Sequence, residues 1–191
     1  MGRVSKAEAA RHREQVVAAA ARLFRERGVH GISLSDLMAD VGLTHGGFYR
    51  QFASKEALAA EATRSAFQEL GGSLTEMAER HSDDWTAARE ALADYYLSQD
   101  HRDEPGTGCP AAGLCGDVGH EGSESPLRAS YTGGIRSFVD ALGDFSGDPA
   151  DRAGKIATLC TLVGGLLLAR ATAGDPVSDE ILEAAKARVV G

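Results

Sequence analysis

Residues 33–52 hold two short stretches of helical periodicity, separated by a turn that contains a glycine. Apolar side chains of the first stretch recur three and four residues apart, at Leu34, Leu37, Met38 and Val41. Ser33 precedes this stretch as an expected N-cap, and Gly42 ends it. Thr44 is the expected N-cap of the second stretch, which runs through Phe52. Two short helices joined by a tight, glycine-containing turn predict a helix-turn-helix motif.

The remaining chain also has helical periodicity, and no alternating pattern typical of strands competes with it. The expected helices lie at 6–27, at 55–80 and at about 84–100, 110–118, 126–145, 149–173 and 178–189. The predicted fold class is therefore all-α. We divide it into a head, residues 1–55, with the helix-turn-helix, and a helical body, residues 56–191.

Charge is distributed unevenly between these two parts. The net charge is −8 with histidines neutral, but the head holds nine Lys and Arg against five Asp and Glu. A positive head attracts the phosphates of a nucleic acid, whereas a negative body is repelled by them. The distribution favours a nucleic-acid partner for the head alone.

The second short helix is the expected recognition helix, the one that contacts base edges in DNA. Phe48 and Phe52 lie one turn apart and are expected to face inward. The opposite face carries His45, Gly46, Tyr49 and Arg50. The Thr44 hydroxyl and the free N–H groups at the helix start suit a phosphate, while Arg50 and His45 suit base edges.

Gly46 and Gly47 each cost about 1 kcal/mol relative to alanine inside a helix. Close approach of the helix backbone to DNA would explain them, and so would tight packing against neighbouring helices. Tyr49 has two interpretations as well, a contact to DNA or a half-buried aromatic ring with a hydrated hydroxyl.

Residues 33–58, SLSDLMADVGLTHGGFYRQFASKEAL, resemble the DNA-binding domain of the TetR family of bacterial transcriptional regulators. The first helix, which ends in LFRERG, extends the resemblance to about residues 8–60. It implies an all-α homodimer that binds a palindromic operator in double-stranded DNA and is released by a small molecule bound in its C-terminal domain. It also implies phosphate contacts from Thr44, Tyr49 and Lys55. Many members carry a small polar side chain at the position of Gly47, so base reading from there is in doubt. The expected DNA-binding set is Ser33, Thr44, His45, Gly46, Gly47, Tyr49, Arg50 and Lys55.

A dimer is also expected on physical grounds, because one short helix reads only a few base pairs and useful specificity needs two half-sites. The last two expected helices carry apolar and small residues that suit an interface: Leu159, Val163, Gly164, Leu167, Ile181, Leu182 and Ala185. The alternative is that these residues form a stripe of the internal core.

Residues 106–122 contain six glycines in 17 positions, which makes a poor helix. We expect this segment to line or gate the site of a small-molecule effector of unknown identity. The expected lining, each member of which could instead be plain core, is Trp85, Tyr95, Tyr96, Cys109, Tyr131 and Phe138.

Cys109 supports an alternative, a repressor of the same fold that senses thiol-reactive compounds. It stands at an expected helix N-cap, where backbone N–H groups lower the pKa of a thiol. Cys115 follows six residues later, and both could equally be inert. With His120 they match no standard zinc spacing, so no metal or cofactor is expected.

Other classes of protein fit less well. No phosphate-binding glycine loop, nucleophile elbow or HExxH pair indicates an enzyme. An acidic protein-interaction module would not explain the basic head. The longest apolar run, Ile156–Ala169, is shorter than the roughly 18 residues of a membrane span, and no membrane partner is expected. Three cysteines and no recognisable leader favour the cytoplasm.

Overall fold

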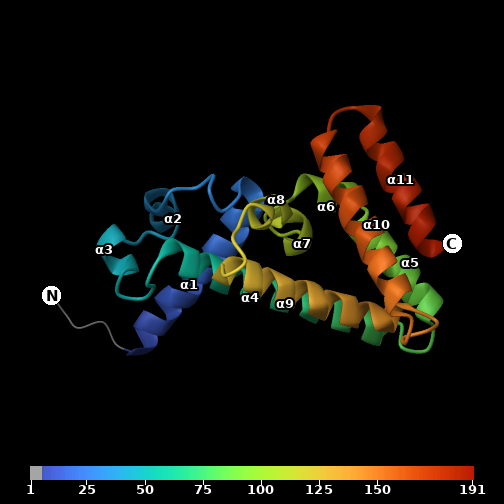
Figure 1. Ribbon diagram of the computed structural model, residues 1–191, viewed down its shortest axis with the longest axis horizontal. Coiled ribbons are helices and arrows are strands. Elements are labelled where there is room, and N and C mark those ends of the chain that lie inside the picture. The colour runs from blue at the N-terminus through green and yellow to red at the C-terminus, as the bar shows by residue number, and fades with distance from the viewer. Residues whose placement is uncertain (1–5) are drawn as a thin grey trace.

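The computed structural model describes residues 6–191, apart from the side chains of Lys6 and His45. Within that range it contains helices and no strand (Figure 1). In chain order they are α1 (Lys6–Arg27), α2 (Leu34–Asp40), α3 (His45–Phe48), α4 (Lys55–Arg80), α5 (Trp85–Tyr96), α6 (Gln99–Asp103), α7 (Pro110–Gly113), α8 (Cys115–Gly119), α9 (Pro126–Ala141), the 3-10 helix η1 (Leu142–Phe145), α10 (Arg152–Ala171) and α11 (Pro176–Val190). The prediction of an all-α fold is confirmed.

Helices α1 to α3 pack around the core of the head. Phe24, Leu37 and Phe48 are at most 1% exposed there, and Phe52 stacks on Phe48 with ring centroids 5.3 Å apart. Because these side chains come from all three helices, the core fixes the orientation of α3 relative to the other two.

Helix α4 passes from the head into the body. Leu58 and Ala62 in its first half belong to the core of the head, while Leu70 and Leu74 in its second half belong to the core of the body. The helix thus runs through the expected boundary after residue 55 without interruption. One continuous helix therefore connects the two cores.

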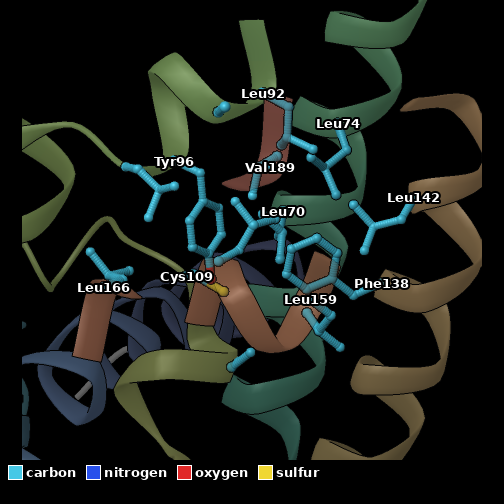
Figure 2. Close-up of a cluster of buried hydrophobic side chains, with 14 of the residues drawn as sticks. Leu70, Leu74, Leu92, Tyr96, Cys109, Phe138, Leu142, Leu159, Leu166 and Val189 are labelled. Atoms are coloured by element: carbon cyan, nitrogen blue, oxygen red, sulfur yellow. The ribbon is translucent and has the colours of Figure 1, made fainter. Parts of the chain in front are cut away.

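The core of the body lies between α4, α5, α9, α10 and α11. Tyr96, Leu162 and Leu166 are 0% exposed, and Figure 2 shows Tyr96 pointing toward Cys109 beside Leu70. Helix α9 lies along α4 (Figure 1), and a Cβ added at Gly134 would overlap the Phe67 ring. A glycine is therefore required where these two helices meet.

The glycine-rich segment forms two short helices in place of the single weak helix expected at 110–118. α7 and α8 meet at Leu114, and both Leu114 and Val118 pack into the core of the head. The helix expected at 84–100 ends at Tyr96, because the Ser98 side chain accepts a hydrogen bond from the backbone N–H of His101 and caps α6.

Candidate nucleic-acid interface and ligand cavity

The turn between α2 and α3 is a tight connection that depends on glycine. Ser33 caps α2 by accepting a hydrogen bond from the backbone N–H of Asp36 at 3.1 Å. Gly42 adopts φ +67°, a conformation that side chains other than glycine rarely adopt. The backbone N–H of Leu43 then donates to the Met38 carbonyl at 2.9 Å. These bonds fix the angle at which the chain enters α3.

Helix α3 is shorter than expected. Its regular part ends at Phe48, and a turn over residues 49–51 follows. The N–H of Phe52 still donates to the Phe48 carbonyl at 3.0 Å, so the chain keeps a helical path to that residue. Two consecutive glycines in a four-residue helix explain the early end, since glycine is a poor helix former.

The outer face of α3 is open to solvent. Tyr49 is 63% exposed, whereas its neighbour Phe48 is buried beneath it with ring centroids 5.1 Å apart. Arg50 is exposed, and Thr44 adopts the N-cap conformation without a capping bond from its side chain. The His45 side chain, expected at a base edge, lies outside the described part of the structure. Thr44 at the start of α3, and Tyr49 and Arg50 just after its end, are thus all accessible.

The packing explanation for the two glycines is wrong. A Cβ added at Gly46 would meet nothing within 4 Å, and one at Gly47 would meet only the Thr44 hydroxyl oxygen at 3.7 Å. No neighbouring helix therefore requires glycine at either position. Open space around both leaves room for another molecule to approach the α3 backbone.

Lys55 connects two parts of the head through a hydrogen bond. It is half-buried, and its ammonium donates to the Ile32 carbonyl at 2.5 Å, which joins the start of α4 to the loop before α2. An ammonium has three donors, so this bond leaves capacity for a phosphate. The position at the start of a long helix suits an anion as well.

Part of the positive charge of the head is used internally. Arg13 pairs with Glu61, and Arg22 pairs with Glu26 at 3.0 Å and with Asp40 at 2.8 Å. Arg25 is 9% exposed. Fewer Arg and Lys side chains of the head are therefore available to a nucleic acid than the count of nine suggests.

A cleft of about 780 Å³ opens between α4, α5 and α6 in the body. Its wall holds apolar, aromatic and charged side chains: Ser73, Leu74, Glu76, Met77, Arg80, His81, Ala91, Asp94, Tyr95, Ser98, Asp100, His101, Glu104 and Thr107. Four of these residues also line a smaller inner cavity of about 50 Å³: Ser73, Tyr95, His101 and Thr107. Arg25 and Cys109 line the inner cavity as well. The two cavities therefore adjoin each other and share part of their walls.

His101 holds the glycine-rich segment against the end of α5. Its Nε2 accepts a hydrogen bond from the Cys109 backbone N–H at 2.9 Å, so its Nδ1 carries the proton and donates to the Tyr96 carbonyl at 2.7 Å. Burial lowers the pKa of His101 to about 4, and the nearby Arg170 guanidinium acts in the same direction. The ring is therefore neutral at pH 7 and bridges two backbone segments.

Only some of the aromatic residues expected to line the ligand site do line the cleft. Tyr95 lines the cleft and is 44% exposed, whereas Tyr96 and Phe138 lie inside the core. Tyr131 is half-buried, and its hydroxyl donates to the Ala111 carbonyl at 2.6 Å. Trp85 lies at the start of α5, where its ring packs against Gly147, and it lines none of the cavities described above.

Cys109 stands at the N-cap of α7, as expected, but its environment differs from the one predicted. The thiol is 2% exposed, and burial raises its pKa, although backbone N–H groups of α7 act in the opposite direction. Desolvation outweighs the N-cap because the thiol is buried. The expected lowering of the pKa is therefore wrong.

The inner cavity adjoins a junction between head and body. The Arg25 guanidinium, on α1, donates to the Gly108 carbonyl at 3.0 Å and lies 3.6 Å from the Glu69 carboxylate. The Asp117 carboxylate accepts a hydrogen bond from the Val29 backbone N–H at 3.1 Å. The glycine-rich segment, which lines the cavity through Thr107, Gly108 and Cys109, is thus bonded directly to the end of α1.

Helices α10 and α11 lie side by side and pack against each other (Figure 1). Exposed apolar side chains remain on α10. Leu159 and Leu182, both expected at an interface, are instead buried in the body core, as the alternative of a core stripe holds. The other expected interface residues are half-buried: Val163, Gly164, Leu167, Ile181 and Ala185. All of them except Gly164 also pack against the body core, as the alternative of a core stripe predicts. Beside them Ile156 is 42% and Leu168 59% exposed.

Helix α10 is also long and apolar enough to cross a membrane by length and composition, contrary to the estimate from the longest apolar run. Only 28% of its most apolar window is buried within the chain. Its exposed side chains therefore form an apolar surface that needs an explanation.

Comparisons with known proteins agree with this architecture. The sequence profile described as bacterial regulatory proteins, tetR family, matches residues 16–62. An uncharacterised HTH-type transcriptional regulator of Mycobacterium tuberculosis is 30% identical over 168 residues, which span 83% of this chain and 84% of that protein.

Two solved structures share the fold at lower identity. The reduced form of Escherichia coli NemR is 23% identical and aligns with a TM-score of 0.79 over 94% of this chain and 95% of that one. A TetR-family transcriptional regulator from Cytophaga hutchinsonii is 22% identical and aligns with a TM-score of 0.79 over 100% of this chain and 98% of that one. The curated relative and the matching profile describe DNA-binding transcriptional regulators, not enzymes. With its helix-turn-helix head and helical body, this chain belongs to the tetR family of bacterial regulatory proteins.

Proposed function

We propose that the protein is a cytoplasmic, ligand-responsive repressor that binds a palindromic operator as a homodimer. The observation that carries this proposal is the accessible turn of α3, where Thr44, Tyr49 and Arg50 lie around two glycines with open space above their backbone. An exposed helix with two glycines in its first turn suits the major groove of DNA. Ser33 and Lys55 stand beside it at the starts of α2 and α4.

The homodimer is supported by the uncovered apolar face of α10 and α11. Val163, Gly164 and Leu167 share this face with the exposed Ile156 and Leu168. Gly164, where an added Cβ would meet nothing within 4 Å, would allow the same face of a second copy to approach closely. Such an interface would cover the apolar surface of α10 without a membrane and would place two α3 helices on one operator.

The junction between the cleft and α1 supports control by a small molecule. A ligand that enters the cleft reaches His101 and Thr107, and the adjoining Gly108 carbonyl is held by Arg25 of the head. A shift of the glycine-rich segment would therefore be transmitted to α1 through this bond and through the bond between Asp117 and Val29. Its effect would be to change the distance between the two α3 helices and release the operator. Burial of Cys109 and the raised pKa of its thiol disfavour the alternative of thiol sensing.

A mobility-shift experiment tests this function. The probe is the DNA upstream of the protein's own gene, and the logarithm of the binding constant should fall linearly with the logarithm of salt concentration, by about 0.9 per phosphate contact. Arg50→Ala should weaken binding, whereas Arg136→Ala, which removes an exposed charge from the body, should not. Absence of binding to any DNA at low salt would refute the proposal.

A further inference from the structure

The cleft between α4, α5 and α6 has a strongly acidic wall. Four carboxylates line it, one each from α4, α5 and α6 and one from the segment that follows: Glu76, Asp94, Asp100 and Glu104. Among its described lining residues, Arg80 is the single Lys or Arg. His101 is neutral at pH 7, because its pKa is about 4. The wall is therefore negative at physiological pH.

Most of this negative charge is not neutralised by the protein. Asp94 forms an ion pair with Lys186 of α11. The side chains of Glu76, Asp100 and Glu104 form no ion pair or hydrogen bond within residues 6–191. Two guanidiniums near the inner end, those of the buried Arg25 and the half-buried Arg170, bind backbone carbonyls and do not line this cleft. Three free carboxylates thus surround a space of about 780 Å³.

The same cleft has an aromatic and apolar side. The Tyr95 ring is 44% exposed and stacks on the His101 ring, with centroids 5.7 Å apart and planes 18° apart. A tyrosine face attracts cations within about 6 Å of its centre. Leu74 and Met77 complete the wall, and a methionine side chain adapts to irregular ligands.

We propose that this cleft binds an organic cation with an aromatic or branched apolar body, and that such a cation is the class of effector to which the protein responds. A cation relieves the mutual repulsion of the three free carboxylates, whereas an anion is repelled and a neutral ligand leaves them uncompensated. The aromatic and apolar side chains hold the body of the ligand. This inference rests on the proposed ligand-responsive function and names the chemistry of its ligand.

The second large cavity provides a comparison within the same protein. It measures about 690 Å³ and lies between α4 and α9, and its described lining contains no carboxylate. Its lining includes Arg64, whose guanidinium donates to the Ser130 hydroxyl at 2.8 Å. A cation should therefore prefer the acidic cleft. Substitution of the carboxylates that line the acidic cleft should not affect a ligand bound in the second cavity, between α4 and α9.

Tetraphenylphosphonium and tetraphenylborate test the inference, because they share size and shape and carry opposite charges. Titration of the full chain by calorimetry and by thermal unfolding should show that the phosphonium binds and raises the melting temperature. The borate should bind at least ten-fold more weakly. Equal binding of the two ions, or no binding of the phosphonium, would overturn the inference.

Substitutions locate the binding. Glu76→Gln, Asp100→Asn and Glu104→Gln should each raise the Kd for the phosphonium roughly two- to five-fold, and the triple variant should raise it more than ten-fold. These side chains hold nothing else in place, so the variants should fold. Glu79→Gln, an exposed substitution on α4 outside the cleft, is the matched control and should leave the Kd unchanged. Phosphonium binding that survives the triple variant would overturn the inference.

The mobility shift separates this inference from the proposed function. A wild-type protein that binds its operator but not the phosphonium refutes the inference alone. A protein that binds the phosphonium in the cleft but binds no DNA supports the ligand class and refutes the proposed function. A protein that keeps its operator while the phosphonium is bound refutes the statement that such a cation is the effector. If the phosphonium releases the operator from the wild type but not from the triple variant, both the inference and the proposed function are supported.

Discussion

Acidification should weaken the fold through one buried histidine, His101. Its folded-state pKa is about 4, against 6.5 for an ordinary histidine. The unfolded chain therefore binds a proton at this site below pH 6.5 while the folded chain does not. The stabilisation is fully present above pH 6.5 and is lost as the pH falls toward 4. The shift of about 2.5 pKa units corresponds to about 3 kcal/mol of unfolding free energy.

Urea denaturation at a series of pH values measures this loss. Wild type and His101→Gln should be compared at one protein concentration, because the stability of a dimer depends on concentration. All other titrating groups are shared, so the wild type should lose stability more steeply by about 1.4 kcal/mol per pH unit between pH 6 and 4.5. The ring resonances of His101 should also not titrate above pH 5. Parallel pH profiles for the two proteins would refute the reasoning.

Three further outcomes follow from the packing and from the exposed surfaces. Gly134→Ala should lower the free energy of unfolding by about 1–3 kcal/mol in urea, because the added Cβ overlaps the Phe67 ring, whereas Gly133→Ala, with no neighbour within 4 Å, should not. Gly46→Ala should raise the melting temperature slightly, since alanine favours a helix by up to about 1 kcal/mol, but should weaken operator binding in a mobility shift; unchanged binding would exclude close approach of DNA to this backbone. Leu168→Asp should shift the protein from dimer to monomer in sedimentation without unfolding it, because the side chain is 59% exposed in one copy; a persistent dimer would place the interface elsewhere.

The local elements were predictable because short-range interactions determine them. Ser33 caps α2, Gly42 adopts the left-handed turn, and Phe48 and Phe52 lie inside the head, as the spacing of these residues predicts. Each outcome depends on a few neighbours along the chain. The early end of α3 was harder to predict. The sequence shows two poor helix formers, Gly46 and Gly47, but packing against the core decides how many residues after them remain helical.

The composition of the ligand cleft was only partly predictable. Tyr95 was expected there, but Tyr96, one residue further, lies in the core, because one step along a helix turns the side chain by about 100° around the axis. The four carboxylates gave no local signal, since a charged residue on a helix usually faces solvent. They share a cleft because α4, α5 and α6 meet, and no spacing along the chain encodes that meeting.

By itself, the sequence determined an all-α chain with a helix-turn-helix head, since helical periodicity, caps and glycines act within a few residues. Tertiary structure alone decided which charges remain available. It pairs Arg13 and Arg22 within the head and buries Arg25 against Gly108, while Glu76 and Glu104 have no ion-pair partner among the described residues. The physical reason is that Coulomb interactions and desolvation depend on distances between residues far apart in the chain, which only the packed helices define.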